Sequence, residues 1–430
     1  MVYAAGLDFG TSGARLVVID EAQQTVATTH VTYGDRADKS DWASCWLRTL
    51  WQVLAALPAA VRSQLGAIAI NGTSATVTLC DSRGHLVTPP LLYNDDRGQA
   101  HRHALAHIAP AASPVLSATS SLVKLLWWRE TLPPEQQESA RYLLHQADWL
   151  ASQLHGQLGL SDYHNALKLG YDVGKLAYPE WLLALVETLE VEPWLPRVQA
   201  PGSAFGQISE AASNRYDLPR DCIVIAGTTD SIAAFLASGA RSPGNAVTSL
   251  GSTLVIKLLS TTRVDDSRYG IYSHRLGDLW LVGGASNTGG AVLRQFFTDA
   301  ELRNLSAQIP RDRASSLNYY PLPCPGERFP ISDPTLAPRL TPRPENPADF
   351  LHGLLEGMAR IEAQGYERLG ALGATAPTQI MTAGGGAQNA IWTAIRERWL
   401  PAPVTTAAST EAAFGTASLA LQGWQDISQS

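Results

Sequence analysis

The stretch Gly6-Leu7-Asp8-Phe9-Gly10-Thr11-Ser12-Gly13-Ala14-Arg15 lies almost at the start of the chain and predicts a tight β-hairpin. Apolar residues 2–7 precede the bend and the β-branched run 16–19 follows it, as is typical of two paired strands. Gly10 and Gly13 can adopt positive φ, and the hydroxyls of Thr11 and Ser12 lie between them. Such a bend can turn several backbone N–H groups towards one phosphate. An ordinary hairpin explains the same residues, so the bend alone leaves both interpretations open.

Asp8 stands at the end of the incoming strand of this hairpin. A carboxylate at that position is within reach of a bound metal ion or a reacting hydroxyl. Asp8 is therefore the first candidate for a chemical role.

The bulk composition is that of a globular protein with more than one domain. The chain has 430 residues, 45% of them hydrophobic and 17% charged, which predicts two or three folded domains and argues against disorder. A net charge of −7 shows no basic excess, which argues against nucleic acid or an anionic membrane as a partner. We therefore expect any bound anion to be held by local amides, hydroxyls and metal.

The cysteines and the N-terminus predict a cytoplasmic protein. The four cysteines are scattered without a C-x-x-C pair, so they favour reduced packing residues over a disulfide frame or zinc site. The chain shows no signal peptide and no apolar run of membrane-spanning length.

The second half of the chain repeats the strand–turn pattern of the first. A buried strand at 223–225 runs into Gly227-Thr228-Thr229-Asp230, and a strand at 246–250 runs into Gly251-Ser252-Thr253. A third strand at 379–382 enters Ala383-Gly384-Gly385-Gly386. Two related hairpins about 240 residues apart predict two similar domains that face a shared cleft.

Two other polar groups carry weaker signals. His103 and His107 share a helical face at i,i+4, as zinc-binding pairs do, and His101 lies beside them. No Glu follows His103 and no cysteine is near, so a solvated helix face is favoured. The polar loop from Ser161 to Lys168 has no role that its residues alone can assign.

Four glycine- and hydroxyl-rich turns, each after a predicted strand, occur in an order that resembles the actin/Hsp70/sugar-kinase superfamily. They are Leu7-Asp8-Phe9-Gly10-Thr11-Ser12, Gly227-Thr228-Thr229-Asp230, Leu250-Gly251-Ser252-Thr253 and Ala383-Gly384-Gly385-Gly386-Ala387-Gln388-Asn389. More narrowly, the chain resembles the FGGY carbohydrate kinases over essentially its whole length. Tyr93-Asn94-Asp95-Asp96-Arg97 is similar to their Trp-Asn-Asp-x-Arg motif, and Glu356-Gly357 and Glu411-Ala412-Ala413-x-Gly415-x-Ala417 also match.

This resemblance implies an α/β fold with two ribonuclease-H-like (actin-like ATPase) domains flanking a central cleft. It implies an N-terminal, sugar-side domain over 1–241, joined by the final helix 412–430, and a C-terminal, nucleotide-side domain over 242–411. We expect a hinge near 238–245, where Gly239, Pro243 and Gly244 interrupt the pattern. The resemblance is compatible with a homodimer.

The resemblance also assigns roles to residues. Asp230 is implied as the general base that accepts the proton of a sugar hydroxyl, and Asp8 as the carboxylate near Mg²⁺, which it would hold through water. The implied sugar-binding residues are Asp8, Ser74, Asp95 and Asp230. A structural ion pair is the alternative role for Asp95 and Arg97. The implied ATP-binding residues are Thr11, Ser12, Gly251, Ser252, Thr253, Gly384, Gly385, Gly386, Asn389 and Trp392.

Several sequence strings in the predicted sugar-side domain favour a particular substrate. His145-Gln146-Ala147-Asp148-Trp149-Leu150 and Ser161-Asp162-Tyr163-His164-Asn165-Ala166-Leu167-Lys168 are similar to short D-ribulose kinases, also labelled xylulose-kinase-like. Gly72-Thr73-Ser74-Ala75-Thr76 stands where xylulose kinases carry Gly-Gln-Met-His, and Tyr93 replaces their usual Trp. We therefore expect an ATP-dependent kinase for the terminal O5 of a ketopentose, D-ribulose before D-xylulose.

Three alternatives stay open at this point. One is another polyol or sugar kinase of the family, such as one for glycerol or L-ribulose. The second is a nucleotide-gated protein like Hsp70 or actin, and the third is a catalytically inactive sugar sensor. The presence of both Asp8 and Asp230 argues against the last two.

Overall fold

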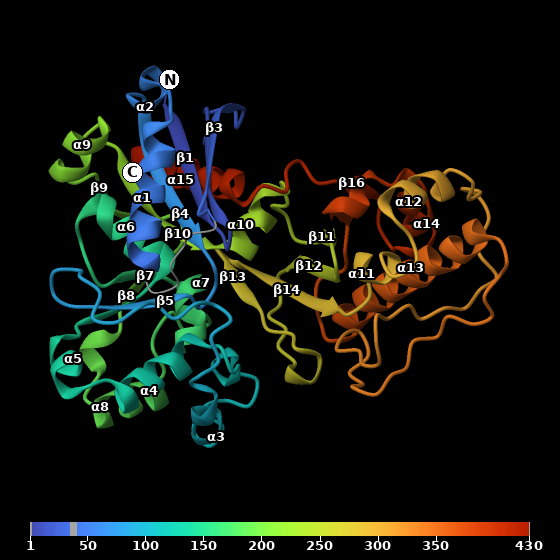
Figure 1. The fold of residues 1–430 in the computed structure, drawn as a ribbon, viewed down its shortest axis with the longest axis horizontal. Helices are drawn as coiled ribbons and strands as arrows, with labels where there is room; N and C mark the ends of the chain where they lie inside the picture. Colours follow the sequence, from blue (N-terminus) through green and yellow to red (C-terminus); the bar gives the residue numbers. More distant parts are fainter. Residues whose placement is uncertain (1, 35–40, 430) are drawn as a thin grey trace. The chain divides into compact units, whose positions relative to one another are not determined.

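The computed structural model describes residues 2–34 and 41–429. The chain divides into two compact units: unit 1 comprises Met1–Ala237 with Glu411–Ser430, and unit 2 comprises Ser238–Thr410. Each unit is built on a six-stranded mixed sheet (Figure 1).

The sheet of unit 1 has the order β3-β2-β1-β4-β10-β9. Its strands are β1 (Tyr3–Phe9), β2 (Gly13–Ile19), β3 (Thr25–Thr32), β4 (Leu65–Gly72), β9 (Ala204–Gln207) and β10 (Ile223–Thr229). Strands β1, β2 and β3 pair antiparallel, as the N-terminal hairpin predicted. Strands β1, β4 and β10 run parallel, so their carboxyl ends share one edge of the sheet.

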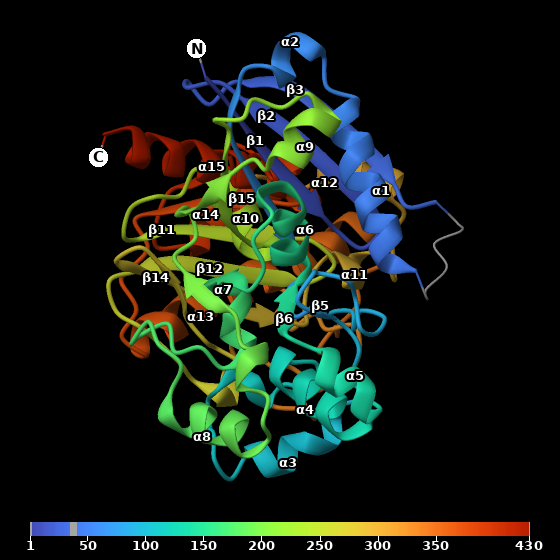
Figure 2. The same ribbon diagram turned by 90° about the vertical axis from the view of Figure 1, so that its left-hand side faces the viewer.

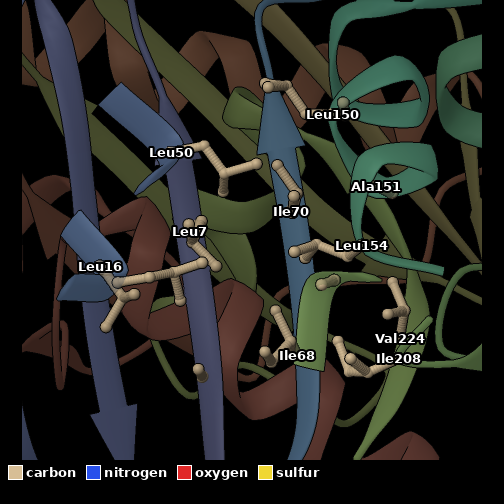
Figure 3. Packing of buried hydrophobic residues seen from close by; sticks show 14 of the residues in the cluster. Leu7, Leu16, Leu50, Ile68, Ile70, Leu150, Ala151, Leu154, Ile208 and Val224 are labelled. Atoms are coloured by element: carbon tan, nitrogen blue, oxygen red, sulfur yellow. The ribbon is translucent and has the colours of Figure 1, made fainter. Parts of the chain in front are cut away.

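One face of this sheet is covered by α1 (Trp42–Ala55), α6 (Gln146–His155) and α9 (Glu210–Tyr216) (Figure 2). Figure 3 shows Leu7, Ile68 and Ile70 of the sheet packed with Leu50 of α1 and Leu154 of α6. Alternate residues of β1 and β4 face this core because side chains alternate across a strand. The sequence offers Ser40 or Asp41 as the cap of α1; the Asp41 carboxylate accepts from the Ser44 N–H, and Ser40 lies outside the described residues.

The opposite face is covered by α15 (Ala412–Gln429), which is rich in small residues. A Cβ on Gly6 of β1 would overlap the backbone of Ala417, and a Cβ on Gly415 would overlap the Ala233 carbonyl. Glycine is therefore required at both positions by close backbone approach rather than by φ. Through these contacts the last helix of the chain belongs to unit 1 (Figure 1).

A second part of unit 1 follows β4 and has its own hydrophobic core. It contains the two-stranded pairs β5 (Val77–Cys80) with β6 (Tyr142–His145) and β7 (Leu160–Asp162) with β8 (Arg197–Gln199). Its longest helix is α4 (Ser121–Thr131), which is buried along most of its length. The other helical segments of unit 1 are α2 (Ala59–Arg62), η1 (Gln99–His101), α3 (Arg102–Leu105), η2 (Pro114–Leu116), α5 (Pro134–Ser139), α7 (Tyr163–Ala166), η3 (Leu167–Leu169), α8 (Glu180–Thr188), η4 (Glu192–Trp194) and α10 (Asp230–Ala237).

Unit 2 repeats the topology with the order β13-β14-β12-β11-β15-β16. Its strands are β11 (Asn245–Leu250), β12 (Leu254–Ser260), β13 (His274–Leu276), β14 (Leu279–Ser286), β15 (Gln379–Ala383) and β16 (Val404–Thr406). Its helical segments are η5 (Ser267–Tyr269), α11 (Gly290–Leu293), α12 (Asp299–Ser306), α13 (Pro347–Ala371), η6 (Gly385–Gln388) and α14 (Ala390–Trp399). Helices α13 and α14 pack on its core.

Both sheets contain the same arrangement of three antiparallel strands extended by two parallel ones: β3-β2-β1-β4-β10 in unit 1 and β14-β12-β11-β15-β16 in unit 2. The predicted α/β fold with two ribonuclease-H-like sheets is thereby confirmed. Within residues 2–34 and 41–429, the structure contains no helix that is both long and apolar enough to span a bilayer.

Candidate active site

Two carboxylates lie at the shared carboxyl edge of the unit 1 sheet. Asp8, on β1, is opposite Asn71 of β4, and Asn71 is opposite Thr228 of β10. Asp230 begins α10 directly after β10, and its Oδ1 accepts a hydrogen bond of 2.6 Å from the Ser231 N–H. The sheet therefore brings together the two acidic residues that the sequence singled out, although they are 222 positions apart.

The environment of Asp8 makes it titrate close to neutrality. Burial and the negative charge of Asp230, opposed by the Arg15 guanidinium, together raise the pKa of Asp8 to about 6. Arg15 lies across from Asp8 on β2 and pairs with Glu411. A buried carboxyl coupled to a second carboxylate is a common arrangement at catalytic sites.

One oxygen of Asp8 is left without a protein partner. Its Oδ1 is buried and accepts no hydrogen bond from the residues that the structure describes. Among all the residues that the structure describes, no group of three or more His, Cys, Asp or Glu side chains is placed to hold a metal ion. These facts fit Mg²⁺, which keeps several waters and uses one or two carboxylates together with substrate phosphates. Asp8 is the residue that would hold such a hydrated ion.

A lysine to which the sequence assigned no role interacts electrostatically with Asp230. Lys168, in η3, is largely buried, which lowers the pKa of its ammonium, and the charge of Asp230 acts in the opposite direction. Lys168 ends the polar 161–168 loop, and nothing in the sequence indicates the direction of its side chain. A cation near the predicted base is suited to bind an anionic or hydroxyl-rich ligand.

The 161–168 segment contacts β10 close to the start of α10, where Asp230 lies. Ser161 Oγ donates to Asp148 Oδ2 at 2.5 Å, and Asp162 caps α7 by accepting from the N–H groups of His164 and Asn165. The His164 Nδ1 lies 2.7 Å from the Thr228 hydroxyl, two residues before Asp230. Burial raises the pKa of Asp162, which lies beside Asp148. This buried polar network fixes the strand that carries Asp230.

The two sugar-side segments of the sequence lie in the second part of unit 1. Ser74 is partly exposed in the turn after β4, where Thr73 donates to Gln146 Oε1. Arg97 donates Nε–H to Asp95 Oδ1 at 3.0 Å and Nη2–H to Asp95 Oδ2 at 2.6 Å. The ion pair that the sequence offered as the structural role for Asp95 and Arg97 is thus formed.

In unit 2, three glycine turns converge. The Gly290 N–H donates to the Gly251 carbonyl at 2.9 Å and the Ala291 N–H donates to the Ser252 carbonyl at 3.0 Å. A Cβ on Gly384, whose φ is +81°, would lie 2.8 Å from the Leu250 carbonyl. The predicted ATP turns 251–253 and 384–386 therefore lie around one strand end, with the Gly289–Gly290 turn as an unpredicted third member.

The other predicted nucleotide residues lie beside these turns. Asn389 caps α14 by accepting from the N–H groups of Ile391 and Trp392, and its Nδ2 donates to Ser306 Oγ. Trp392 is only 3% exposed and packs beneath Gly386, where a Cβ would lie 2.8 Å from its ring. Arg294, which the sequence did not single out, donates to the Ser252 hydroxyl at 2.8 Å.

Two sequence expectations are refined by the structure. The N-terminal bend is exposed at Thr11 and Ser12. Positive φ is found at neither Gly10 nor Gly13; Gly13 is required instead because a Cβ there would overlap the Val31 carbonyl. In the histidine group, α3 ends at Leu105, so the predicted helical face shared by His103 and His107 is not formed; both side chains are exposed, and His101 Nε2 lies 3.0 Å from Glu130 Oε2.

Comparison with known proteins identifies the same architecture elsewhere. Residues 3–237 match the N-terminal domain and residues 246–424 the C-terminal domain of the FGGY family of carbohydrate kinases. The chain is similar to a xylulose kinase from Streptomyces rubiginosus, 28% identical over 274 residues that cover 61% of this chain and 55% of that protein. It is also similar to a xylulose kinase from Staphylococcus xylosus, 21% identical over 99% of this chain and 92% of that one. The first of these matches spans only about half the length of the relative.

A solved structure shares the fold. The crystal structure of a xyloylose kinase from Brucella ovis superposes with a TM-score of 0.84 at 24% identity, covering 99% of this chain and 91% of that one. At that level of identity the likeness concerns the fold.

Proposed function

The chain belongs to the FGGY family of carbohydrate kinases, and from that premise we propose that it transfers the γ-phosphoryl group of ATP to the O5 hydroxyl of a ketopentose. The observation that carries this proposal is the pair Asp8 and Asp230, electrostatically coupled at one edge of the unit 1 sheet. A protein that only binds nucleotide has no need of a second, base-like carboxylate there.

Asp230 is the general base of this proposal. Its carboxylate orients the sugar O5 hydroxyl towards phosphorus and accepts the proton as the O–P bond forms. An ordinary carboxylate is too weak to remove an alcohol proton beforehand, so the proton moves late in the step. Lys168, which senses the charge of Asp230, offsets the negative charge of the carboxylate and of the incoming phosphoryl group.

The glycine turns of unit 2 are the proposed seat of ATP. Backbone N–H groups of 251–253 bind phosphate oxygens, while 384–386, Asn389 and the buried Trp392 shape the adenosine site. Mg²⁺ would be held at Asp8 Oδ1 through water and would neutralise phosphate charge.

Ser74 and the Asp95–Arg97 pair are the proposed contacts to the sugar hydroxyls. Both lie in the segments where the sequence departs from xylulose kinases, and this favours D-ribulose as the substrate. D-Xylulose is the second candidate because the relatives named above are xylulose kinases.

The test is an initial-rate assay of ADP formation with D-ribulose, D-xylulose, L-ribulose and glycerol, with ³¹P NMR to locate the phosphate on the product. We expect turnover with a ketopentose, fastest with D-ribulose, and phosphate on O5. If the rate is higher with D-xylulose than with D-ribulose, D-xylulose replaces D-ribulose as the proposed substrate. ADP formation no faster with any sugar than with water refutes the kinase proposal and favours a sugar sensor or nucleotide-gated protein.

Water competes with the sugar for ATP, so we also propose that binding of both substrates closes the protein around the 238–245 segment. Small-angle scattering is expected to show a smaller radius of gyration with sugar plus a non-hydrolysable ATP analogue. An unchanged radius argues against closure.

A further inference from the structure

Lys124, in the first turn of α4, carries a buried charge that the proposed chemistry does not use. Its side chain is 0% exposed. No carboxylate within the described part of the chain lies at ion-pair distance from its ammonium. Burying a charge without an ionic partner is costly unless hydrogen bonds compensate, so the contacts of this ammonium indicate its purpose.

The ammonium binds two backbone carbonyls from two different segments. Lys124 Nζ donates to the Ala75 carbonyl at 2.7 Å and to the Leu92 carbonyl at 2.6 Å. Ala75 directly follows Ser74, and the Leu92 carbonyl also accepts from the Asp95 N–H at 3.0 Å. One side chain thus joins the turn that carries Ser74 to the turn that carries Asp95.

The backbone of each of these turns depends on contacts with other segments. Ala75 has φ of +65°, in the left-handed region that non-glycine residues rarely occupy. The Asp95 turn is also held on α4, because the Arg97 guanidinium lies 4.9 Å from the Trp127 ring centroid. A Cβ on Gly98 would overlap the Val123 carbonyl, so the backbone of the turn rests directly on the helix.

Helix α4 is itself firmly anchored at its N-terminus. The Ser120 hydroxyl caps it by accepting from the Val123 N–H. Ser121 Oγ lies 3.0 Å from His145 Nε2, and His145 Nδ1 lies 3.2 Å from Asp148 Oδ2, all within the buried interior. Lys124 therefore projects from a fixed support rather than from a mobile loop.

We propose that Lys124 is a positioning residue for sugar binding: its ammonium sets the spacing between Ser74 and Asp95 that the sugar hydroxyls require. This inference rests on the proposed function, since it takes these two turns as the sugar contacts. It predicts that Lys124 controls the KM for the sugar and not the KM for ATP.

The charge state of Lys124 offers a separate readout. Burial, opposed by the Asp95 carboxylate and reinforced by the Lys168 and Arg97 cations, lowers the pKa of Lys124 to about 7. Lys124 Nζ carries all three protons below about pH 7 and loses one of them as the pH rises above that value. The sugar KM of the parent protein is therefore expected to rise between about pH 6 and pH 9.

The test compares Lys124→Met with Leu125→Ala, a buried apolar neighbour on the same helix that carries no charge. We expect Lys124→Met to raise the sugar KM about 10- to 100-fold, with the ATP KM unchanged and no rise of sugar KM with pH. Hydrogen exchange at the amides of 73–76 and 93–98 is expected to quicken in Lys124→Met and to stay parental in Leu125→Ala. Both variants are measured with D-ribulose and D-xylulose.

A parental sugar KM with parental exchange in Lys124→Met overturns the inference, as does an equal rise of sugar KM in both variants, which indicates packing alone. If Lys124→Met does not fold, Lys124→Arg decides, because its charge does not titrate: a sugar KM independent of pH supports the inference and the parental profile overturns it. If the parent phosphorylates no sugar, the proposed function fails, while the exchange comparison still tests whether Lys124 positions the two turns.

Discussion

The two units share a sheet topology, but two buried polar groups of unit 1, on Asp8 and Lys124, lack among the described residues the ionic partner that the buried ion pair of unit 2 has. In unit 2 the fully buried Arg396 donates Nε–H and Nη2–H to the two oxygens of the equally buried Glu362, at 2.7 and 2.8 Å. In unit 1, Asp8 keeps a buried oxygen without a partner from the described residues, and Lys124 bonds only to carbonyls. The buried ion pair of unit 2 is satisfied within the protein and is structural, whereas the Asp8 oxygen of unit 1 is available to a ligand.

The closed network of unit 2 supports its glycine turns. Glu362 also accepts from the Thr248 hydroxyl of β11, and Arg396 Nη1 donates to the Thr382 hydroxyl of β15. These hydrogen bonds tie α13 and α14 to the strands that end at the 251–253 and 384–386 turns. A satisfied ion pair can be purely structural, whereas a partnerless buried carboxylate lowers stability and persists where function needs it.

The largest effect is expected from Asp230→Asn in unit 1. Removing the base should lower kcat about 10²- to 10⁴-fold, with little change in the KM of sugar or ATP, because the amide keeps the shape but cannot take the proton. Steady-state ADP release measures this. Asp221→Asn, at the other end of β10 and exposed, is the matched control. Parental kcat in Asp230→Asn would remove the proposed base.

The second prediction concerns the paired charges of unit 2. Glu362→Gln leaves the Arg396 guanidinium buried without its counter-charge and should lower the free energy of unfolding by about 3–5 kcal/mol. Denaturant unfolding followed by tryptophan fluorescence measures this. Exposed Glu397→Gln on α14 should be neutral. Equal stability of Glu362→Gln and Glu397→Gln would show that the buried pair is not the scaffold described above.

The smallest effect is expected at the edge of the sugar site. Arg97 has a half-exposed side chain, with 53% of its surface accessible, so solvent weakens its pairing with Asp95. Arg97→Met should change the free energy of unfolding by less than about 1 kcal/mol and raise the sugar KM only a few-fold. A loss of sugar binding as large as that expected for Lys124→Met would mean that the ion pair, rather than Lys124, sets the Asp95 turn.

The fold and the two catalytic candidates were predicted from short local motifs and from the family resemblance that those motifs carry. The hairpin around Asp8 is contiguous, and Asp230 follows a short apolar strand, so each position was readable without tertiary information. The repeat of strand and turn in the second half predicted the second sheet for the same reason. Parallel strands then bring Asp8 and Asp230 to one edge because of the fold itself.

The remaining site features depend on contacts that no local pattern encodes. Lys124 lies in an apolar helix segment beside Trp127 and Trp128, where no local motif marks it as part of a site. Its two carbonyl partners are 49 and 32 positions away. The burial of Trp392 under Gly386 and the approach of Gly290 to Gly251 are likewise set by packing between distant turns. Only the three-dimensional structure reveals them.

The pKa of Asp8 gives a measurable consequence of the missing partner in unit 1. Its folded pKa of about 6 lies above the ordinary value of 3.8, so the unfolded chain ionises first as the pH rises. The contribution of Asp8 to stability therefore falls between about pH 4 and pH 6, and the penalty is complete above pH 6.

The most direct measurement is the unfolding free energy of Asp8→Asn against the parent at about pH 7.5 and about pH 4, together with its sugar phosphorylation. We predict that Asp8→Asn is more stable than the parent at the higher pH, by about 3 kcal/mol at most. That gain should vanish at the lower pH, and phosphorylation should be lost. An Asp8→Asn protein that is less stable than the parent at about pH 7.5, or that phosphorylates sugar at the parental rate, would contradict the account.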